Sequence, residues 1–116
     1  MQTIVIVDDH AEFRKAAAAL LAVEGFDVVG EASDAGEAFE TVGRLRPEVV
    51  LLDIQLPGLD GLAVAEQLAD RPDPPAVVLI SSRDAAAYGD RLQRAPARGF
   101  IQKSALSGEA IEALLS

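Results

Sequence analysis

The chain has 116 residues, of which 50% are hydrophobic, so we expect one domain over residues 1–116 and not two. It has no cysteine, which excludes disulfides and thiolate zinc sites, and neither its start nor its apolar runs fit a signal peptide or a membrane span, so we expect a cytoplasmic protein without membrane contact. The formal net charge of −9 disfavours direct binding to nucleic acid, because a phosphate backbone would repel such a surface.

The first strand is predicted by the apolar run from Thr3 to Val7. The following helix is predicted by apolar residues that recur at the spacing of one helix face, namely Phe13, Ala17, Leu20 and Leu21. Gly25 ends this helix, and the run from Phe26 to Ala32 predicts the second strand.

The second helix is predicted by a capping box, in which Asp34 is followed three residues later by Glu37. The residues of this helix that we expect to face the core are Ala38, Phe39, Val42 and Leu45. Pro47 ends the helix. The continuous apolar run from Val49 to Leu52 is typical of a central parallel strand covered on both faces, and Asp53 follows at its carboxyl end.

After this strand, Pro57-Gly58 predicts a turn and Gly61 a permissive backbone position. A short helix is expected over residues 62–68, then a proline-rich loop over 71–75 and a fourth strand from Ala76 to Ile80.

A fourth helix is predicted after Asp84. It is alanine-rich, contains Gly89 and has little amphipathic contrast, so we expect it to be the least firmly held helix. The run from Phe100 to Gln102 predicts a short fifth strand. Ser107 is expected to cap a last helix whose inner face carries Ile111, Leu114 and Leu115.

Five strands that alternate with five helices predict a doubly wound (βα)5 fold of the α/β class, a flavodoxin-like three-layer sandwich. We expect a parallel sheet in the order 2-1-3-4-5 with right-handed crossovers. In such a sheet the ligand site lies beyond the carboxyl ends of the strands.

Polar residues follow the predicted strands at that edge, and they are Asp8, Asp9, Asp53, Ser81, Ser82 and Lys103. Carboxylates that lie close together must hold protons or be neutralised by a cation, and oxygen ligands favour magnesium or manganese. Asp53 would then act as a nucleophile in aspartyl-phosphate chemistry, with Lys103 and the Ser81 hydroxyl stabilising the phosphoryl oxygens.

Four motifs resemble the receiver domains of bacterial two-component response regulators, and the resemblance extends over nearly the whole chain. They are Val-Asp-Asp-His at 7–10, Leu-Leu-Asp-Ile-Gln-Leu-Pro-Gly-Leu-Asp-Gly at 51–61, Ser81-Ser82, and Gly-Phe-Ile-Gln-Lys at 99–103. The Asp-Asp-His and Lys-Ser pieces are similar to the NarL/LuxR class, which carries a carboxyl-terminal helix-turn-helix domain.

The resemblance implies that Asp53 accepts a phosphoryl group from a sensor histidine kinase or a phosphotransfer protein, in a reaction that depends on Mg2+ or Mn2+. It implies that Asp9 and Asp53 bind the metal directly, that Asp8 acts through water, and that the Gln55 carbonyl completes the ligands.

The resemblance further implies that Ser81 and Phe100 form the switch pair. On this reading the protein is a signalling switch and not an enzyme with a separate substrate. Phosphorylation would favour a homodimer, and the output would be transcription, with a stand-alone relay or docking receiver as the alternative.

Three positions depart from the family pattern. Ser104 follows Lys103, where the family usually has a proline with a cis bond. Pro96 replaces a common glycine before the fifth strand, which should shorten or distort the fourth helix. Ser82 replaces a frequent alanine and would restrict access to the phosphorylation pocket slightly.

Plainer interpretations exist for some of these residues. Asp9 and Glu12 also make an acceptable capping box, and Asp8 would then be a turn residue. We expect His10 to be a surface residue at a helix start, and Tyr88 to be half-buried packing or part of a partner surface.

Two other enzyme or cofactor classes are disfavoured. A phosphatase of the haloacid dehalogenase kind needs a second aspartate where this chain has Gln55. A flavodoxin-like flavin site needs a hydroxyl- and glycine-rich loop where this chain has Asp8-Asp9. A degenerate receiver that only docks is disfavoured by the complete set of reactive residues.

Overall fold

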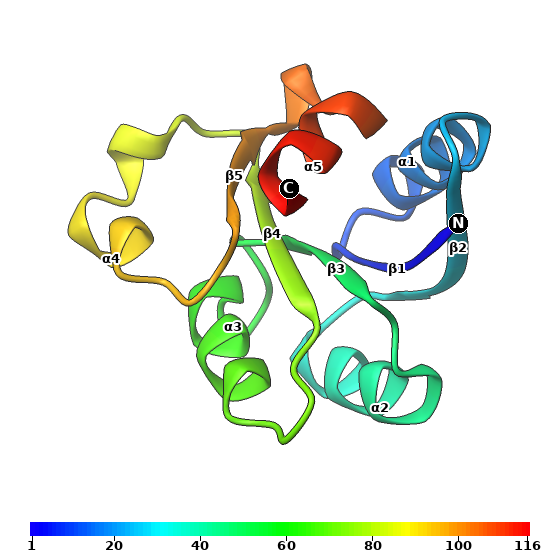
Figure 1. Ribbon diagram of the computed structural model, residues 1–116. Coiled ribbons are helices and arrows are strands. Elements are labelled where there is room, and N and C mark those ends of the chain that lie inside the picture. The colour runs from blue at the N-terminus through cyan, green and yellow to red at the C-terminus, as the bar shows by residue number, and fades with distance from the viewer.

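A parallel five-stranded sheet runs through the centre of the computed structural model, which describes residues 1–116, and its strand order is β2-β1-β3-β4-β5 (Figure 1). The strands are β1 (Gln2–Val7), β2 (Phe26–Ala32), β3 (Val49–Asp53), β4 (Ala76–Ser81) and β5 (Gly99–Gln102). The prediction of a doubly wound α/β fold with this order is therefore confirmed.

Helices cover both faces of the sheet. They are α1 (Ala11–Val23), α2 (Ala35–Leu45), α3 (Gly61–Ala69), α4 (Asp90–Gln93) and α5 (Gly108–Leu115), with 3₁₀ turns at Ala85–Ala87 and Lys103–Ala105. Figure 1 shows α1 and α5 on one side of the sheet and α2 and α3 on the other. None of the helices has the length and apolar character needed to cross a membrane.

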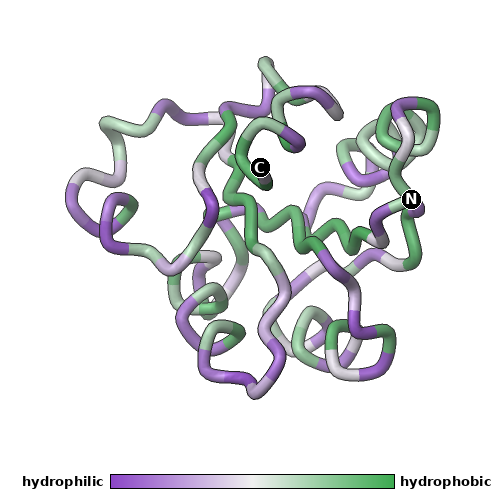
Figure 2. Tube along the Cα trace, viewed as in Figure 1, coloured by the Kyte–Doolittle hydropathy of each residue, from purple (hydrophilic) through white to green (hydrophobic).

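The core consists of two apolar layers, one on each face of the sheet. In β1, Ile4 and Ile6 pack towards α1 and α5, whereas Val5 and Val7 pack towards α2 and α3. All five residues of β3 are buried, and the hydrophobic colour in Figure 2 runs along these central strands. Because both faces are covered, these strands have continuous apolar sequences without polar alternation.

The loop after β3 is held close to the strand end by Gly61, which is not in a left-handed conformation. Its N–H donates to the Ile54 carbonyl at 2.8 Å, and a Cβ atom there would collide with the Asp53 carbonyl oxygen. Asp60 caps α3 by accepting a hydrogen bond from the Ala63 N–H at 2.9 Å. Close approach, and not the expected backbone freedom, therefore requires a glycine at 61.

The prediction of a continuous fourth helix is wrong. The chain forms a 3₁₀ turn at Ala85–Ala87 and then the single turn of α4, and Gly89 with a φ of 57° separates them. This positive φ is incompatible with a right-handed helix, so the helix cannot pass through it. As expected from Pro96, helical structure stops early, at Gln93. We refer to residues 84–95 as the α4 segment.

Some helix faces also differ from expectation. Leu20 is 37% exposed, because the buried side of α1 follows Ala17 and Leu21 and leaves Leu20 at the margin. In α2 the Asp34 carboxylate accepts from the Glu37 N–H at 2.8 Å as predicted, but the Glu37 carboxylate accepts from the Ser33 N–H and not from that of Asp34. The chain has no cis peptide bond.

Gly61→Ala should lower the free energy of unfolding by roughly 1–3 kcal/mol, because the added methyl group must displace backbone. Gly36→Ala is the matched control, because Gly36 lies exposed in α2 and its Cβ would meet only Asp34 Oδ1 at an ordinary 3.5 Å. This control should gain up to about 1 kcal/mol. Urea unfolding followed by circular dichroism measures both, and equal midpoints would contradict the close approach.

Candidate functional site

The carboxyl ends of four strands place polar side chains at one edge of the sheet. Asp8 follows β1, Asp53 ends β3, Ser81 ends β4 and Lys103 follows β5. Asp8 and Ser81 are 0% exposed and Asp53 is 1% exposed. Buried carboxylates are costly unless they are paired, so their surroundings decide whether this edge is stable.

Lys103 pairs with both buried carboxylates. Its Nζ lies 2.6 Å from Asp8 Oδ2 and 3.4 Å from Asp53 Oδ2. The same ammonium lies 4.4 Å from the centre of the Phe13 ring, which is a cation–π distance. One cation thus joins the ends of β1, β3 and β5, and Phe13 of α1 supports it.

The electrostatic balance at this edge is unfavourable for a second full negative charge. Burial, and then the nearby Asp8 carboxylate, raise the pKa of Asp53 to about 6, although the Gln55 N–H and Lys103 partly oppose this shift. Burial also works against the charge of Lys103, but its contacts with Asp8 and Asp53 outweigh burial and raise its pKa. The site is therefore short of positive charge.

The acidic cluster fits a hard divalent cation. Ligand atoms of Asp8, Asp9, His10 and Asp53 lie within 4.8 Å of one another. Asp8 Oδ2 is buried, and the Lys103 ammonium, 2.6 Å away, is its only protein partner. Carboxylate oxygens that lie close together are the donor set that magnesium or manganese prefers.

His10 lies beside these carboxylates. Its ring is 67% exposed at the start of α1, as expected of a surface residue. Its Nδ1 lies 3.0 Å from Asp8 Oδ1 and 3.1 Å from Asp9 Oδ1, a contact that was not predicted. The capping box of Asp9 and Glu12 does not form, because His10 precedes the helix and no side chain caps it.

Ser81 is held by several partners. Its Oγ accepts from the Arg83 N–H at 3.0 Å, lies 2.5 Å from the Tyr88 hydroxyl and lies 3.4 Å from Gln55 Oε1. Ser82 also donates to Gln55 Oε1, at 3.3 Å. The Gln55 side chain therefore accepts from the serine pair, and its backbone N–H donates to Asp53 Oδ1 at 3.1 Å.

Phe100 is half-buried and lies in β5, where it packs on the apolar layer under the α4 segment. Its ring centre is 6.4 Å from that of Tyr88, with the planes tilted by 58°. Tyr88 is half-buried as expected, but its hydrogen bond to Ser81 was not predicted. The bond depends on the turn geometry of residues 85–89. The hydrophobic periodicity of the sequence does not predict this geometry.

Two further contacts were missed for a related reason. Phe13 supports Lys103, and the Arg14 guanidinium donates to the Asp8 carbonyl at 2.6 Å while it pairs with Glu31. Both residues lie in the first turn after the Asp-Asp-His motif, in the part of α1 nearest the site. Their position directly after this motif was the sequence signal that could have identified them as neighbours of the site.

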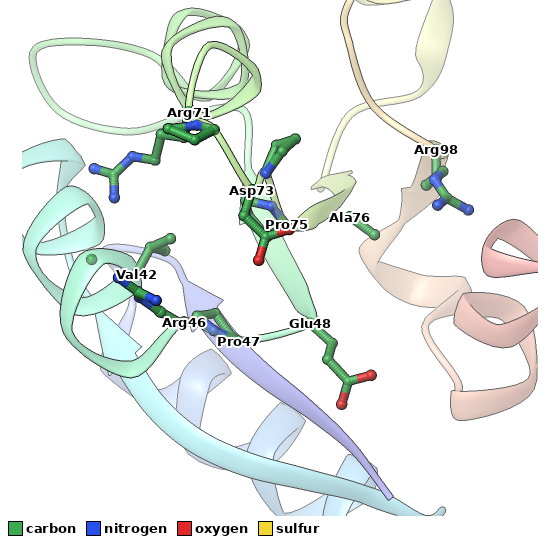
Figure 3. Close-up of a pocket in the computed structure, with 12 residues that line it drawn as sticks. Val42, Arg46, Pro47, Glu48, Arg71, Asp73, Pro75, Ala76 and Arg98 are labelled. Carbon is green, nitrogen blue, oxygen red and sulfur yellow. The ribbon is translucent and has the colours of Figure 1, made fainter.

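A surface hollow of about 650 Å3 lies at the opposite edge of the sheet (Figure 3). It is lined by the segments that precede β3 and β4, including Arg46, Pro47 and Pro75. Its other arginines are engaged, since Arg71 donates to the Phe39 carbonyl and Arg98 to the Leu115 carbonyl. The polar cluster at the carboxyl edge thus remains the candidate site.

Comparison with known proteins identifies a matching family and several relatives. Residues 4–115 match the model of the response regulator receiver domain. The chain is 36% identical over 113 residues to the transcriptional regulatory protein NarL of Mycobacterium tuberculosis, covering 97% of this chain and 52% of that protein. It is 30% identical over 99 residues to the DNA-binding transcriptional activator EvgA of Escherichia coli K12, covering 85% of this chain and 48% of that protein.

The chain therefore spans about half the length of the curated relatives it matches. Among solved structures, the signal receiver domain of NarL from Mycobacterium tuberculosis superposes with a TM-score of 0.85 at 36% identity, covering 98% of this chain and 93% of that one. A LuxR-family DNA-binding response regulator from Staphylococcus aureus has a TM-score of 0.87 at 21% identity, which supports the fold alone.

Removing the Asp53 charge should stabilise the metal-free protein. A raised carboxyl pKa means that the folded state holds its proton more tightly than the unfolded state, so this contribution is present at acid pH and is lost as pH rises from about 4 through about 6. With chelator present, Asp53→Asn should therefore raise the free energy of unfolding at pH 8, by up to about 3 kcal/mol relative to the wild type, and have little effect near pH 4.

Denaturant unfolding across this pH range provides the measurement. Asp27→Asn is the control, because Asp27 is an exposed carboxyl in β2, away from the carboxyl-end cluster. A stability difference between Asp53→Asn and the wild type that does not vary with pH would contradict the raised pKa.

Proposed function

Since this chain belongs to the response regulator receiver domain family, we propose that Asp53 is the residue that accepts the phosphoryl group. The observation that carries this proposal is the position of Asp53, which lies buried at a strand end with Lys103 3.4 Å away and Asp8 beside it. Phosphoryl transfer requires alignment and charge compensation more than covalent catalysis by the protein, and this edge offers both.

In the proposed reaction, an Asp53 carboxylate oxygen attacks the phosphorus atom of a phosphohistidine or a small acyl phosphate. The new O–P bond forms as the bond to the donor breaks, and the donor leaves with that electron pair. Asp53 must be ionised to attack, and a pKa of about 6 leaves most molecules ionised at neutral pH. The Lys103 ammonium and the Ser81 hydroxyl then stabilise the phosphoryl oxygens.

Receiver domains of this family use Mg2+ at their acidic pocket. Here we propose that Asp9 and Asp53 bind Mg2+ or Mn2+ directly, that Asp8 acts through water, and that the Gln55 carbonyl completes the protein ligands. The bound ion would neutralise phosphoryl charge during transfer. The close grouping of the Asp8, Asp9 and Asp53 carboxylates, with the single ammonium of Lys103 beside them, supports this assignment.

Receiver domains of response regulators interact with histidine kinases. We propose that a sensor histidine kinase or a phosphotransfer protein is the phosphoryl donor, and that the protein is a switch that promotes only its own phosphorylation and dephosphorylation. Phosphorylation would draw the Ser81 hydroxyl towards the new anion, Phe100 would turn into the vacated space, and the changed surface would favour a homodimer.

For the output, we propose control of transcription. Relatives named as transcriptional regulators, NarL and EvgA, are about twice as long as the region they share with this chain. In such an arrangement, the residues described here would form the receiver part. A relay or docking receiver without DNA-binding output is the alternative.

A phosphatase of the haloacid dehalogenase kind fits the site poorly. Position 55 holds a neutral amide whose oxygen accepts from Ser81 and Ser82. An amide cannot exchange a proton with a leaving group or with water at neutral pH, so rapid turnover of an aspartyl phosphate has no acid or base at this position.

Asp53→Asn should abolish phosphorylation. Incubation of the wild type with a small acyl phosphate and Mg2+ should add one phosphoryl group per molecule in intact-mass measurements, because Asp53 is the buried nucleophile. Asp84→Asn, which removes an exposed carboxyl beyond β4, should be phosphorylated like the wild type. Equal phosphorylation of Asp53→Asn and the wild type would mean that another residue is the nucleophile.

Metal binding should depend on the acidic cluster. Titration of the wild type with Mg2+ or Mn2+, followed by NMR, should show saturable binding at the carboxyl ends of β1 and β3. An Asp9→Ala, Asp53→Ala double variant should lose this binding, because both direct ligands are removed. Asp73→Ala, in the loop at the opposite edge, serves as the control. Unchanged affinity in the double variant would refute the metal assignment.

A further inference from the structure

The Ser81 hydroxyl has a partner at each of its hydrogen-bonding positions. A serine hydroxyl has one proton to donate and two lone pairs that accept. The Arg83 N–H uses one lone pair at 3.0 Å, and the Gln55 Oε1 atom, which can only accept, lies 3.4 Å away. The Tyr88 hydroxyl lies 2.5 Å from the same oxygen, the shortest of these contacts, and either hydroxyl can be the donor.

Tyr88 supplies a hydroxyl that the β5 aromatic residue lacks. Phe100 has no polar atom with which to sense Ser81, but its ring packs at 6.4 Å from that of Tyr88. A change at Ser81 therefore reaches Phe100 through Tyr88, by one hydrogen bond and one ring contact. A hollow of about 280 Å3, lined by Leu79, Leu92 and Phe100 among others, gives the Phe100 ring room to move.

Few polar contacts hold the α4 segment to the rest of the protein. Two side chains make them, Tyr88 with Ser81, and Arg91 with Asp60 at 2.9 and 3.2 Å. Gly89, with its positive φ, separates the two attachment points. Loss of the Tyr88 bond would leave the exposed Arg91 pair as the remaining polar side-chain link, and such pairs contribute little to stability.

We infer that Tyr88 is a positioning residue that holds the Ser81 hydroxyl in the resting state and competes for it with the phosphoryl group on Asp53. This inference rests on the proposed function. A charged phosphoryl oxygen makes a hydrogen bond roughly twice as strong as a neutral one, so phosphorylation draws Ser81 away from Tyr88. Tyr88 then moves with Phe100 and releases the α4 segment.

Tyr88→Phe tests the inference, because it keeps the ring and its packing and removes only the hydroxyl. Beryllium fluoride with Mg2+ serves as the acyl-phosphate mimic. The variant should bind it roughly 3- to 10-fold more tightly than the wild type, since no Tyr88 bond has to be broken. Without beryllium fluoride, the NMR shifts of residues 84–95 should already have moved towards those of the wild type with beryllium fluoride bound.

A double-mutant cycle isolates the contact. In a Ser81→Ala background, Tyr88→Phe should no longer change the affinity for beryllium fluoride, because the partner hydroxyl is gone. Tyr88 is the only tyrosine and the chain has no tryptophan, so near-ultraviolet fluorescence reports on it directly. Ser81→Ala should change this signal, whereas Ser82→Ala, which removes a hydroxyl that contacts Gln55 and not Tyr88, should leave it unchanged.

The outcomes separate this inference from the proposed function. If beryllium fluoride binds the wild type at Asp53 while Tyr88→Phe shows the same affinity and the same shifts, the inference is overturned and the proposed function stands. If the wild type does not bind beryllium fluoride, both are overturned.

Discussion

The carboxyl edge of this sheet depends on Lys103, which lies between the buried carboxylates of Asp8 and Asp53. Two buried acids at the ends of adjacent strands would repel each other, and one ammonium compensates for only part of that charge. Burial, together with the nearby Asp8 carboxylate, therefore still raises the pKa of Asp53. The proposed metal site fits this deficit, because a further cation at this edge would relieve repulsion that the fold itself creates.

The site imposes requirements on the surrounding chain. Gly61 lets the loop after β3 approach the backbone of Asp53, and Asp60 beside it both caps α3 and pairs with Arg91. Phe13 brings α1 against the ammonium of Lys103. The helices near the site thus contribute short-range contacts, and the sheet supplies the rest of the framework through its two apolar layers.

Sequence patterns predicted the sheet well, because β1, β3 and β4 are covered on both faces and their apolar runs are unbroken. The residues at the strand ends could be placed for the same reason. Sequence patterns wrongly predicted a continuous helix in the α4 segment. There, one positive φ at Gly89 divides a stretch that otherwise has good helix formers. The Tyr88 contact with Ser81 depends on that turn, so neither local propensity nor hydrophobic period could predict it.

The division at Gly89 also bears on how sequence change is tolerated. Leu92 and Tyr88 in the α4 segment are only half-buried, and the fully buried layers lie elsewhere. Substitutions on the outer surface of this segment therefore cost little folding free energy and leave the acidic edge undisturbed. A surface with such freedom can diverge to suit different partners while the chemistry stays constant, so recognition and reaction can evolve separately within one small sheet.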